Sequence, residues 1–206
     1  DLKTLGPCDF AMLELSCKTV SRLASSTQRR LPENHFRGDR GDGRPTDDAI
    51  EYDKTLQHAL DLFTMAKNND PEFAFVLEQP DCVVKHLPIV HTRLLSDSSR
   101  IRCDVIKFSW CKAANVRVHK PTLFFVHNLP ELVDYFGPED EPKFLCTADS
   151  PCAFGGPGCH DSVRGDTKEW TPYPHDLCKM IVNIVSSALA RKRKQPLARA
   201  CEECTD

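Results

Sequence analysis

The sequence predicts an α/β domain in which helices cover a mostly parallel β-sheet, and three observations predict it. The chain has 206 residues, enough to bury one substantial core. Strand-like and helix-like segments alternate along it, as they do in βαβ units. The run FAFVL, Phe73 to Leu77, is apolar at every position, which is typical of a central strand covered on both faces.

The N-terminal region begins with a strand and a long loop. Residues 7–15, PCDFAMLEL, are mostly apolar, so we expect a short strand that leads into Cys17. Residues 25–46 are polar, basic and rich in glycine and proline. This composition predicts a mobile surface loop.

A long amphipathic helix follows this loop. Thr46 is a suitable N-cap, and Asp47 and Asp48 suit the first turn because the helix dipole favours negative charge there. Apolar residues then recur at mostly helical spacing. The apolar strand FAFVL comes next, and Glu78 stands at its end.

The second half of the chain continues the alternation. We expect a helix over 83–95, strands over 102–110 and 121–128, and a short helix over 129–136. Residues 146–172 are rich in cysteine, glycine and proline, which predicts a second long loop.

The C-terminal segment carries the last helix. An apolar stripe predicts a helix over 173–194, and the tail 196–206 is expected to fray. We therefore expect a single domain over 1–195.

Composition narrows the class of protein. The net charge of −3 does not indicate a nucleic-acid binder, so any such contact must come from local basic clusters. Eleven scattered cysteines are expected as reduced thiols. No segment has the ~18 apolar residues of a membrane span, and no signal peptide is recognised, so we expect an intracellular protein that is not in a membrane. Because the chain begins with Asp1, we expect a fragment or a processed product.

Two reactive side chains follow the first two predicted strands. In open α/β sheets, ligands bind outside the carboxyl ends of the strands. Cys17 lies just beyond the first strand and Glu78 ends the second, so parallel neighbouring strands would bring a thiol and a carboxyl to one crevice. A thiolate nucleophile with a nearby acid is a minimal pair for covalent catalysis. The alternative interpretation of Cys17 is an ordinary structural thiol.

A series of motifs along the chain resembles the DNA cytosine-5 methyltransferases, most closely their phage-like and mobile-element branch. The motifs occur in the order of that family and cover most of residues 7–185. They are Asp9-Phe10, Cys17 with Ser21, Asp53-Lys54-Thr55, FAFVLEQP (73–80), KPTLFFVHN (120–128) and YPHDLCKMI (173–181).

The resemblance implies a Rossmann-like methyltransferase fold and a defined chemistry. Cys17 would attack C6 of a cytosine flipped out of DNA, and Glu78 would hold and protonate N3. The activated C5 would then accept the methyl group of S-adenosylmethionine. Ser21 and Arg22 would lie in the nucleophile loop, and Lys120 near the target base or its backbone.

The cofactor-binding part of that family is not found in this chain. The family uses a strand, a glycine-rich turn and a helix at its N-terminal end. FGGPG at 154–158 matches the glycine pattern, but no strand precedes it and no helix follows, so we reject it. We therefore expect the C-terminal portion of the family fold, inactive or incomplete alone, with a missing N-terminal half or a partner chain completing it. Leu15-Ser16 and Gln79 also depart from the family motifs.

Two basic clusters could contact DNA. Arg29 and Arg30 lie in the 25–46 loop with three further arginines, and such a loop either grips phosphates or is simply solvated. The run Arg191 to Lys194 ends the last predicted helix. These cations suit the helix dipole at that end. The alternative interpretations are contact with DNA and a nuclear-import signal, and the latter would imply a nuclear location.

Cysteine and histidine residues suggest a second class of function. Cys146, Cys152, Cys159 and His160 could bind zinc, although their spacing is irregular and a loop with incidental thiols is the alternative. The alternative function is therefore a Cys/His-rich, zinc-dependent nucleic-acid-binding or interaction module without catalysis. A third reading is a thiol redox protein that uses the Cys-x-x-Cys of the tail, at 201–204.

Overall fold

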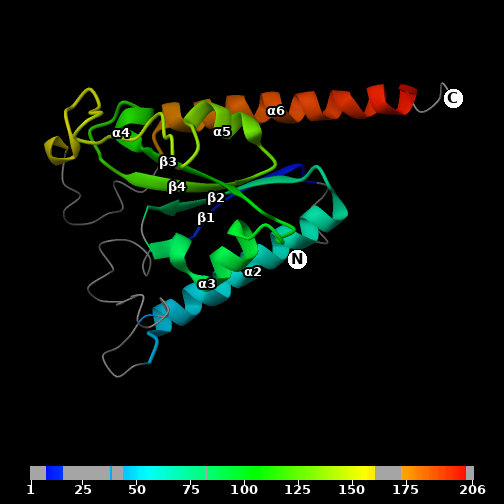
Figure 1. The fold of residues 1–206 in the computed structure, drawn as a ribbon, viewed down its shortest axis with the longest axis horizontal. Coiled ribbons are helices and arrows are strands. Elements are labelled where there is room, and N and C mark those ends of the chain that lie inside the picture. Colours follow the sequence, from blue (N-terminus) through cyan, green and yellow to red (C-terminus); the bar gives the residue numbers. More distant parts are fainter. Residues whose placement is uncertain (1–7, 16–37, 39–43, 82, 161–172, 203–206) are drawn as a thin grey trace.

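The computed structural model describes the backbone of residues 8–15, 38, 44–81, 83–160 and 173–202, with side chains to position 193. Four strands form one sheet with helices on both sides (Figure 1). The strands are β1 (Phe10–Glu14), β2 (Ala74–Pro80), β3 (Asp104–Ser109) and β4 (Pro121–His127). The longer helices are α2 (Asp47–Asn69), α5 (Pro130–Phe136) and α6 (His175–Glu202).

The sheet has the strand order β1-β2-β4-β3 and is mixed. Strands β1 and β2 are parallel and joined through α2, which confirms the first βαβ unit. The expectation of a mostly parallel sheet is wrong, because β4 runs antiparallel to both of its neighbours. The connection from β3 to β4 contains only the short helix α4 (Trp110–Ala113), so the chain returns beside the strand it has just left.

The apolar strand FAFVL lies at the centre of the fold, as predicted. β2 has a neighbour on each side, and its residues from Ala74 to Gln79 are all buried. Adjacent side chains of a strand point to opposite faces, so this strand contributes to two cores. Phe75 stacks on Phe63 of α2 with ring centroids 4.0 Å apart, whereas Val76 belongs to the core on the opposite face.

Different helices cover the two faces (Figure 1). Helix α2 and the short turns after β2 cover one face, and α5 and α6 cover the other. Helix α2 begins as predicted, because the Ala49 amide donates to Thr46 Oγ1 at 3.2 Å. Each large side chain buried in these layers stabilises the fold by about 1.5–3 kcal/mol.

Two helical segments differ from the prediction. Residues 83–95 do not form one helix. They form a 3₁₀ turn (η5, Val83–His86), a short α3 (Pro88–Val90) and a π-helical turn (η6, His91–Leu95). Pro88 has no amide hydrogen, which ends the regular pattern before it. At the C-terminus, α6 continues to Glu202, so its backbone is helical through most of the segment expected to fray.

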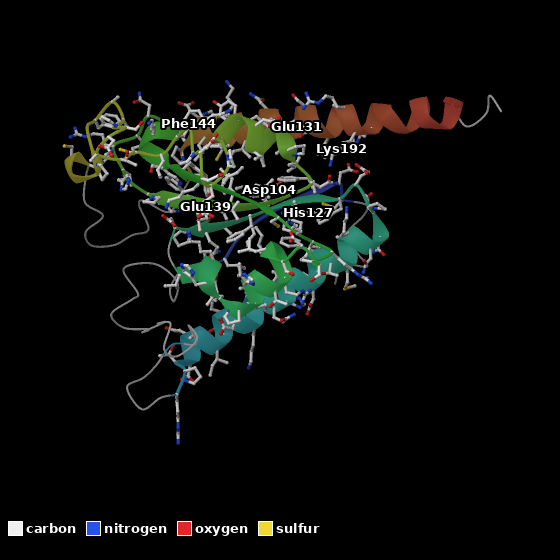
Figure 2. All side chains as sticks on the ribbon, in the orientation of Figure 1. Asp104, His127, Glu131, Glu139, Phe144 and Lys192 are labelled. Atoms are coloured by element: carbon white, nitrogen blue, oxygen red, sulfur yellow. The ribbon has the colours of Figure 1, made fainter. Side chains whose placement is uncertain are left out.

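Contacts to the ends of the strands anchor α6. Lys192 lies above the end of β4, near His127 (Figure 2), and its Nζ donates to Asn128 O at 2.6 Å. Arg191 pairs with Glu131 of α5 at 2.8 Å, and Arg193 pairs with Asp9 beside β1. The basic run thus lies within the helix, not at its end, and these three side chains contact the protein itself.

Candidate functional site

Glu78 lies beside the end of β1, two residues before β2 ends at Pro80. Glu14, the last residue of β1, is in register with Glu78 of β2. Glu78 is 1% exposed, whereas the Glu14 side chain is substantially exposed. The predicted parallel pairing is confirmed, so the chain leaves β1 toward Cys17 beside this carboxyl group. Cys17 itself lies outside the described residues.

Lys120 faces the Glu78 carboxyl from the residue before β4. Its Nζ is 3.7 Å from Glu78 Oε1 and 4.0 Å from Glu14 Oε1. The same ammonium group lies 4.0 Å from the centre of the Trp110 ring and 5.6 Å from that of Tyr173. These five residues form what we call the carboxyl centre, in which one cation contacts two carboxylates and two aromatic rings.

Three buried polar atoms of the carboxyl centre make no hydrogen bond of ordinary geometry among the described residues, although Lys120 and Tyr173 both interact with the Glu78 carboxyl group. They are Glu78 Oε1, Trp110 Nε1 and Tyr173 Oη. The two aromatic rings are 4.8 Å apart. A buried polar group without a partner costs about 1–3 kcal/mol, so such groups are rare unless a ligand or water satisfies them. A polar ligand or water near Lys120 could satisfy these atoms.

Burial controls the acidity of the centre. It raises the pKa of Glu78 to about 7, although the nearby Lys120 ammonium lowers it and Glu14 raises it further. Burial and the Glu78 charge raise the pKa of Tyr173, so its hydroxyl remains a donor at neutral pH. Glu78 can therefore exist in both protonation states near pH 7, which suits a general acid or base.

Gln79 attaches the end of β1 to the rest of the fold. Its Oε1 accepts from the Tyr52 hydroxyl of α2 at 2.9 Å, and its Nε2 donates to Leu15 O at 3.5 Å. Leu15 is buried, so the chain is held at the point where it departs toward Cys17. Gln79, which departs from the family motif, thus holds Leu15, the last described residue before Cys17.

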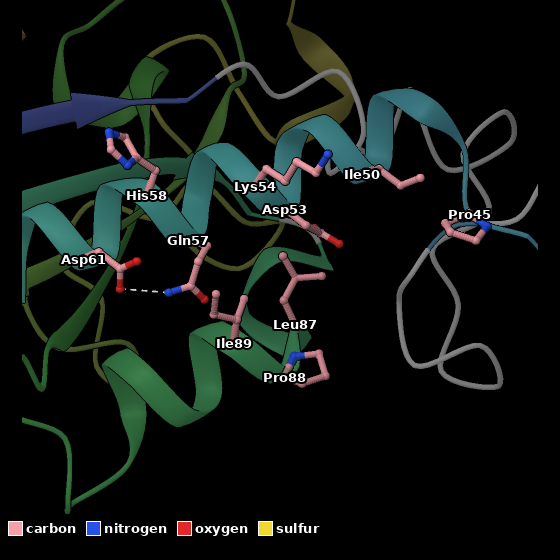
Figure 3. Close-up of a pocket in the computed structure, with 10 residues that line it drawn as sticks. All are labelled: Pro45, Ile50, Asp53, Lys54, Gln57, His58, Asp61, Leu87, Pro88 and Ile89. Atoms are coloured by element: carbon pink, nitrogen blue, oxygen red, sulfur yellow. Dashed lines mark hydrogen bonds between the residues drawn. The ribbon is translucent and has the colours of Figure 1, made fainter.

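A groove of about 690 Å³ runs between α2 and α3 (Figure 3). Its lining includes Asp53, Lys54 and His58 of α2 and Leu87 opposite. None of its lining residues belongs to the carboxyl centre. Asp53 and Lys54 carry part of the family resemblance. They line this groove, whereas Glu78 does not.

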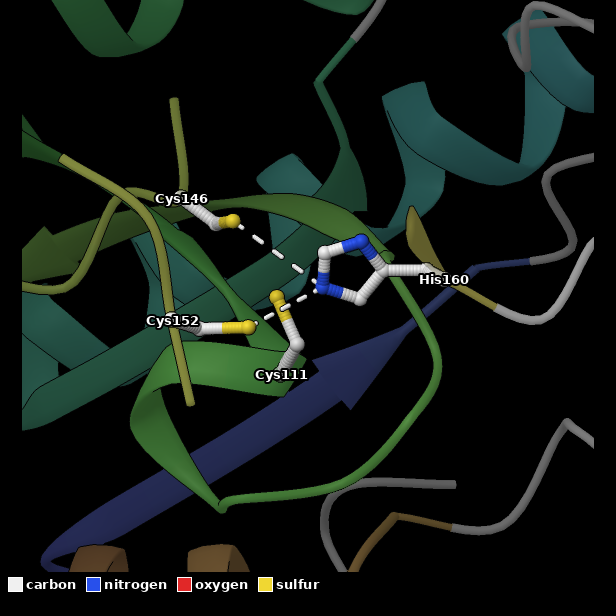
Figure 4. A group of neighbouring side chains, drawn as sticks. All are labelled: Cys111, Cys146, Cys152 and His160. Carbon is white, nitrogen blue, oxygen red and sulfur yellow. Dashed lines mark hydrogen bonds between the residues drawn. The ribbon is translucent and has the colours of Figure 1, made fainter. Parts of the chain in front are cut away.

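Three cysteines and one histidine meet at the β3–β4 connection, which supplies Cys111 (Figure 4). Cys111, Cys146, Cys152 and His160 each offer one ligand atom, and these atoms all lie within 4.8 Å of one another. This Cys3His group could bind a metal ion. It contains three of the predicted ligands, but Cys111 of α4 takes the place of Cys159, which is exposed.

Spacing could not identify Cys111 as a member of the Cys3His group. It follows a predicted strand as an isolated thiol, far in sequence from the loop that supplies the other three ligands. Burial raises the pKa of Cys111. For Cys152, burial also acts to raise the pKa, but hydrogen bonds from the Phe154 amide and His160 outweigh it and lower the pKa to about 7.

Several predicted residues lie outside the described part of the chain. They are Ser21, Arg22, Arg29 and Arg30, together with Cys204 and the side chain of Cys201. The FGGPG segment is described and confirms its rejection as a cofactor loop. Among the described residues, no strand leads into it, and up to position 160 only the 3₁₀ turn η7 (Pro157–Cys159) follows.

Within the described residues, no helix is both long and apolar enough to cross a membrane. Comparisons of the chain with models of protein families, with curated proteins and with solved structures found no match.

Proposed function

We propose that the carboxyl centre binds a cytosine base flipped out of DNA, and that Cys17 and Glu78 act on it as nucleophile and acid. In this proposal the chain is the catalytic portion of a Rossmann-like, DNA cytosine-5 methyltransferase-like protein. One observation carries it: three buried polar atoms that make no ordinary hydrogen bond among the described residues lie around Lys120, beside the end of the strand that leads to Cys17. A flipped base offers the polar edge and the flat face that such a site lacks.

The first chemical step needs only residues of this chain. The Cys17 thiolate forms a bond to C6 of the base, and the electron pair of the C5=C6 double bond moves toward N3. The Glu78 carboxylic acid gives its proton to N3, which neutralises the charge that develops there. The product is an enamine whose C5 is nucleophilic, and the reverse step returns the proton to Glu78 and releases Cys17.

Lys120 supports the charged form of Glu78 in this step. After proton transfer, Glu78 is a buried carboxylate, and the ammonium 3.7 Å away is the cation that stabilises it. The Tyr173 ring packs beside the buried Trp110, and the Tyr173 hydroxyl can donate to a carbonyl of the base.

The methyl donor is not part of this proposal. S-adenosylmethionine would supply a methyl group to C5, but no strand, glycine turn and helix for it occur among the described residues. We therefore derive no step through it.

The addition step can be tested without a methyl donor. The enamine takes up a solvent proton at C5, so this carbon then carries both hydrogen and tritium. Loss of the triton to water, followed by elimination of Cys17, restores the base, so duplex DNA with tritium at C5 of cytosine should release its label. We expect the wild-type chain to release tritium. With Cys17→Ala, release should fall to the level measured without protein. Cys8→Ala changes an exposed thiol at the opposite end of β1 and should retain the activity. No release by the wild type, or equal release by Cys17→Ala, would contradict the proposal.

The second candidate is the Cys/His-rich nucleic-acid-binding or interaction module without catalysis. The Cys3His group favours it, because its four ligand atoms already converge. Such a module would bind duplex DNA without releasing the C5 label, and Glu78→Gln would leave binding unchanged. Binding measured on the same labelled duplex therefore separates the two candidates.

A further inference from the structure

The Cys3His group draws its ligands from three separate segments. Cys111 comes from α4, Cys146 and Cys152 from the segment after α5, and His160 from the end of η7. A tetrahedral zinc site with thiolate and imidazole ligands has ligand atoms about 3.5–3.8 Å apart. Here His160 Nε2 is 3.1 Å from Cys152 Sγ and 3.9 Å from Cys146 Sγ. Since all four ligand atoms lie within 4.8 Å of one another, shifts of up to about 1 Å would match that geometry.

The ligands are oriented by contacts outside the group. His160 Nδ1 lies 3.2 Å from Pro157 O, and in the tautomer that donates Nδ1–H to this carbonyl the Nε2 lone pair faces the sulfur atoms and can bind an ion. A second nitrogen bonded to a carbonyl is the usual arrangement of a metal-bound histidine. The Phe154 amide donates to Cys152 Sγ at 3.4 Å, as suits a thiolate ligand.

Gly155 permits the turn that brings these ligands together. Its φ is +101°, and it forms a β-bridge with Cys152. A Cβ atom at this position would lie 3.0 Å from Cys159 Cβ and Sγ, so a larger residue would disturb the turn. Cys159 thus contacts the turn without joining the Cys3His group.

We propose that Cys111, Cys146, Cys152 and His160 bind one Zn²⁺ in a structural site that holds Lys120 and Trp110 in the carboxyl centre. Four protein ligands fill a tetrahedral shell and leave no open position for substrate, which is characteristic of structural zinc. The ion would therefore act on the neighbouring centre through the backbone, without touching a substrate.

The backbone connects the two sites directly. Cys111 follows Trp110, whose ring contacts the Lys120 ammonium and whose amide donates to Lys120 O at 3.2 Å. On the other side of the connection, the His119 ring lies 5.2 Å from the His160 ring. Cys111 is thus linked to Trp110 through the backbone, and His160 is linked to Lys120 through the ring of the preceding residue, His119.

Further hydrogen bonds attach the ligand-bearing segment to the same connection. The Cys146 amide donates to Ser109 Oγ at 3.2 Å, and Lys112 Nζ donates to Leu145 O at 3.2 Å. These bonds run to residues on either side of Trp110 and Cys111. An ion at the centre of the group would complete a link between this segment, α4 and the start of β4.

Metal content tests the ligand set. The chain would be expressed with added zinc, purified, dialysed and measured for zinc per chain, then exchanged with Co²⁺, whose visible spectrum reports tetrahedral thiolate coordination. We expect one zinc per chain in the wild type and in Cys159→Ser. Cys152→Ser and His160→Gln should bind zinc at least about tenfold more weakly. Both of these positions are only partly buried, so the variants can be checked for a native circular dichroism spectrum.

Each alternative result has a defined meaning. A wild-type chain without zinc and without a tetrahedral Co²⁺ spectrum would overturn the site. Loss of metal in Cys159→Ser, with retention in a Cys111→Ser chain that still folds, would overturn the ligand set and restore the one expected from the sequence.

Fluorescence tests the positioning role. The chain has two tryptophans, so Trp170→Phe leaves Trp110 as the only one. We expect its emission to change when zinc is removed by a chelator and to recover when zinc is added. Cys159→Ser on the same background should respond like the wild type. Unchanged Trp110 emission while one zinc is lost would overturn the positioning role, and none of these measurements depends on DNA chemistry.

Discussion

The carboxyl centre and the Cys3His group both contain residues of the β3–β4 connection, but different forces assemble them. Backbone pairing of β1 with β2 puts Glu14 beside Glu78. The Cys3His group has no such ladder, because its ligands come from short turns and loops. One site therefore forms whenever the sheet forms, whereas the other depends on side chains that must be drawn together.

The two sites also differ in how their polar atoms are satisfied. Glu78 Oε1 is buried and makes no hydrogen bond of ordinary geometry among the described residues. The Cys3His atoms contact one another and nearby backbone groups, as in the bond from the Phe154 amide to Cys152. Buried polar groups are costly unless they are paired. We infer that the first site is kept ready for a substrate, and that the second is completed by an ion.

The largest expected effect is on release of the C5 label, and it distinguishes Glu78 from Glu14, the two carboxylates of the carboxyl centre. Glu78→Gln removes the acid that protonates N3, so release of the C5 label should fall about 10²–10⁴-fold. Glu14→Gln changes the exposed partner in the same register and should cost less than about tenfold. Tritium release at pH 7 measures both. Equal losses in the two variants would mean that general charge, and not acid catalysis, is responsible.

Removal of zinc should have the next largest effect, on stability. A ligand at 1,000 times its Kd stabilises the folded state by about 4 kcal/mol, which corresponds to roughly 10 °C in Tm for a chain of this size. We expect a fall of this order when a chelator is added, measured by thermal denaturation. Cys159→Ser should show the same fall and Cys152→Ser should not. If the chelator leaves the Tm of the wild type unchanged, zinc does not complete the Cys3His group.

The pH dependence of stability should identify the burial of Glu78. Its folded pKa, about 7, is above the unfolded value of 4.5. The group therefore binds more protons in the folded state, and its stabilising contribution is full below pH 4.5 and lost as pH rises through 7. The change amounts to about 3 kcal/mol. Urea denaturation of Glu78→Gln should lack this slope, and an identical slope in both chains would disprove the buried carboxyl.

The smallest expected effect concerns Lys120. Its ammonium lowers the pKa of Glu78, so Lys120→Met should raise that pKa further, by about one unit. The pH midpoint of the stability profile should shift upward accordingly. Lys107→Met is the control, because Lys107 pairs instead with Asp81 at 2.7 Å. A shift in the control as large as that in Lys120→Met would show that the pairing with Glu78 is not specific.

Local patterns predicted the parts of the fold in which neighbours in sequence are neighbours in space. Thr46 is the cap of α2, and FAFVL is the central strand. The meeting of β1 and β2 was predictable because a βαβ unit places its two strands side by side. The direction of β4 was not predictable, because an apolar strand has the same pattern in parallel and antiparallel pairs.

The sequence by itself determined where the reactive side chains lie along the chain. It predicted that Glu78 ends the strand next to the one before Cys17, and that Cys146, Cys152 and His160 share one loop. Only the tertiary structure decided that Lys120 faces Glu78 and that Cys111 replaces Cys159. Both depend on how the β3–β4 connection packs against a segment distant in sequence, and such packing leaves no period or spacing in the chain.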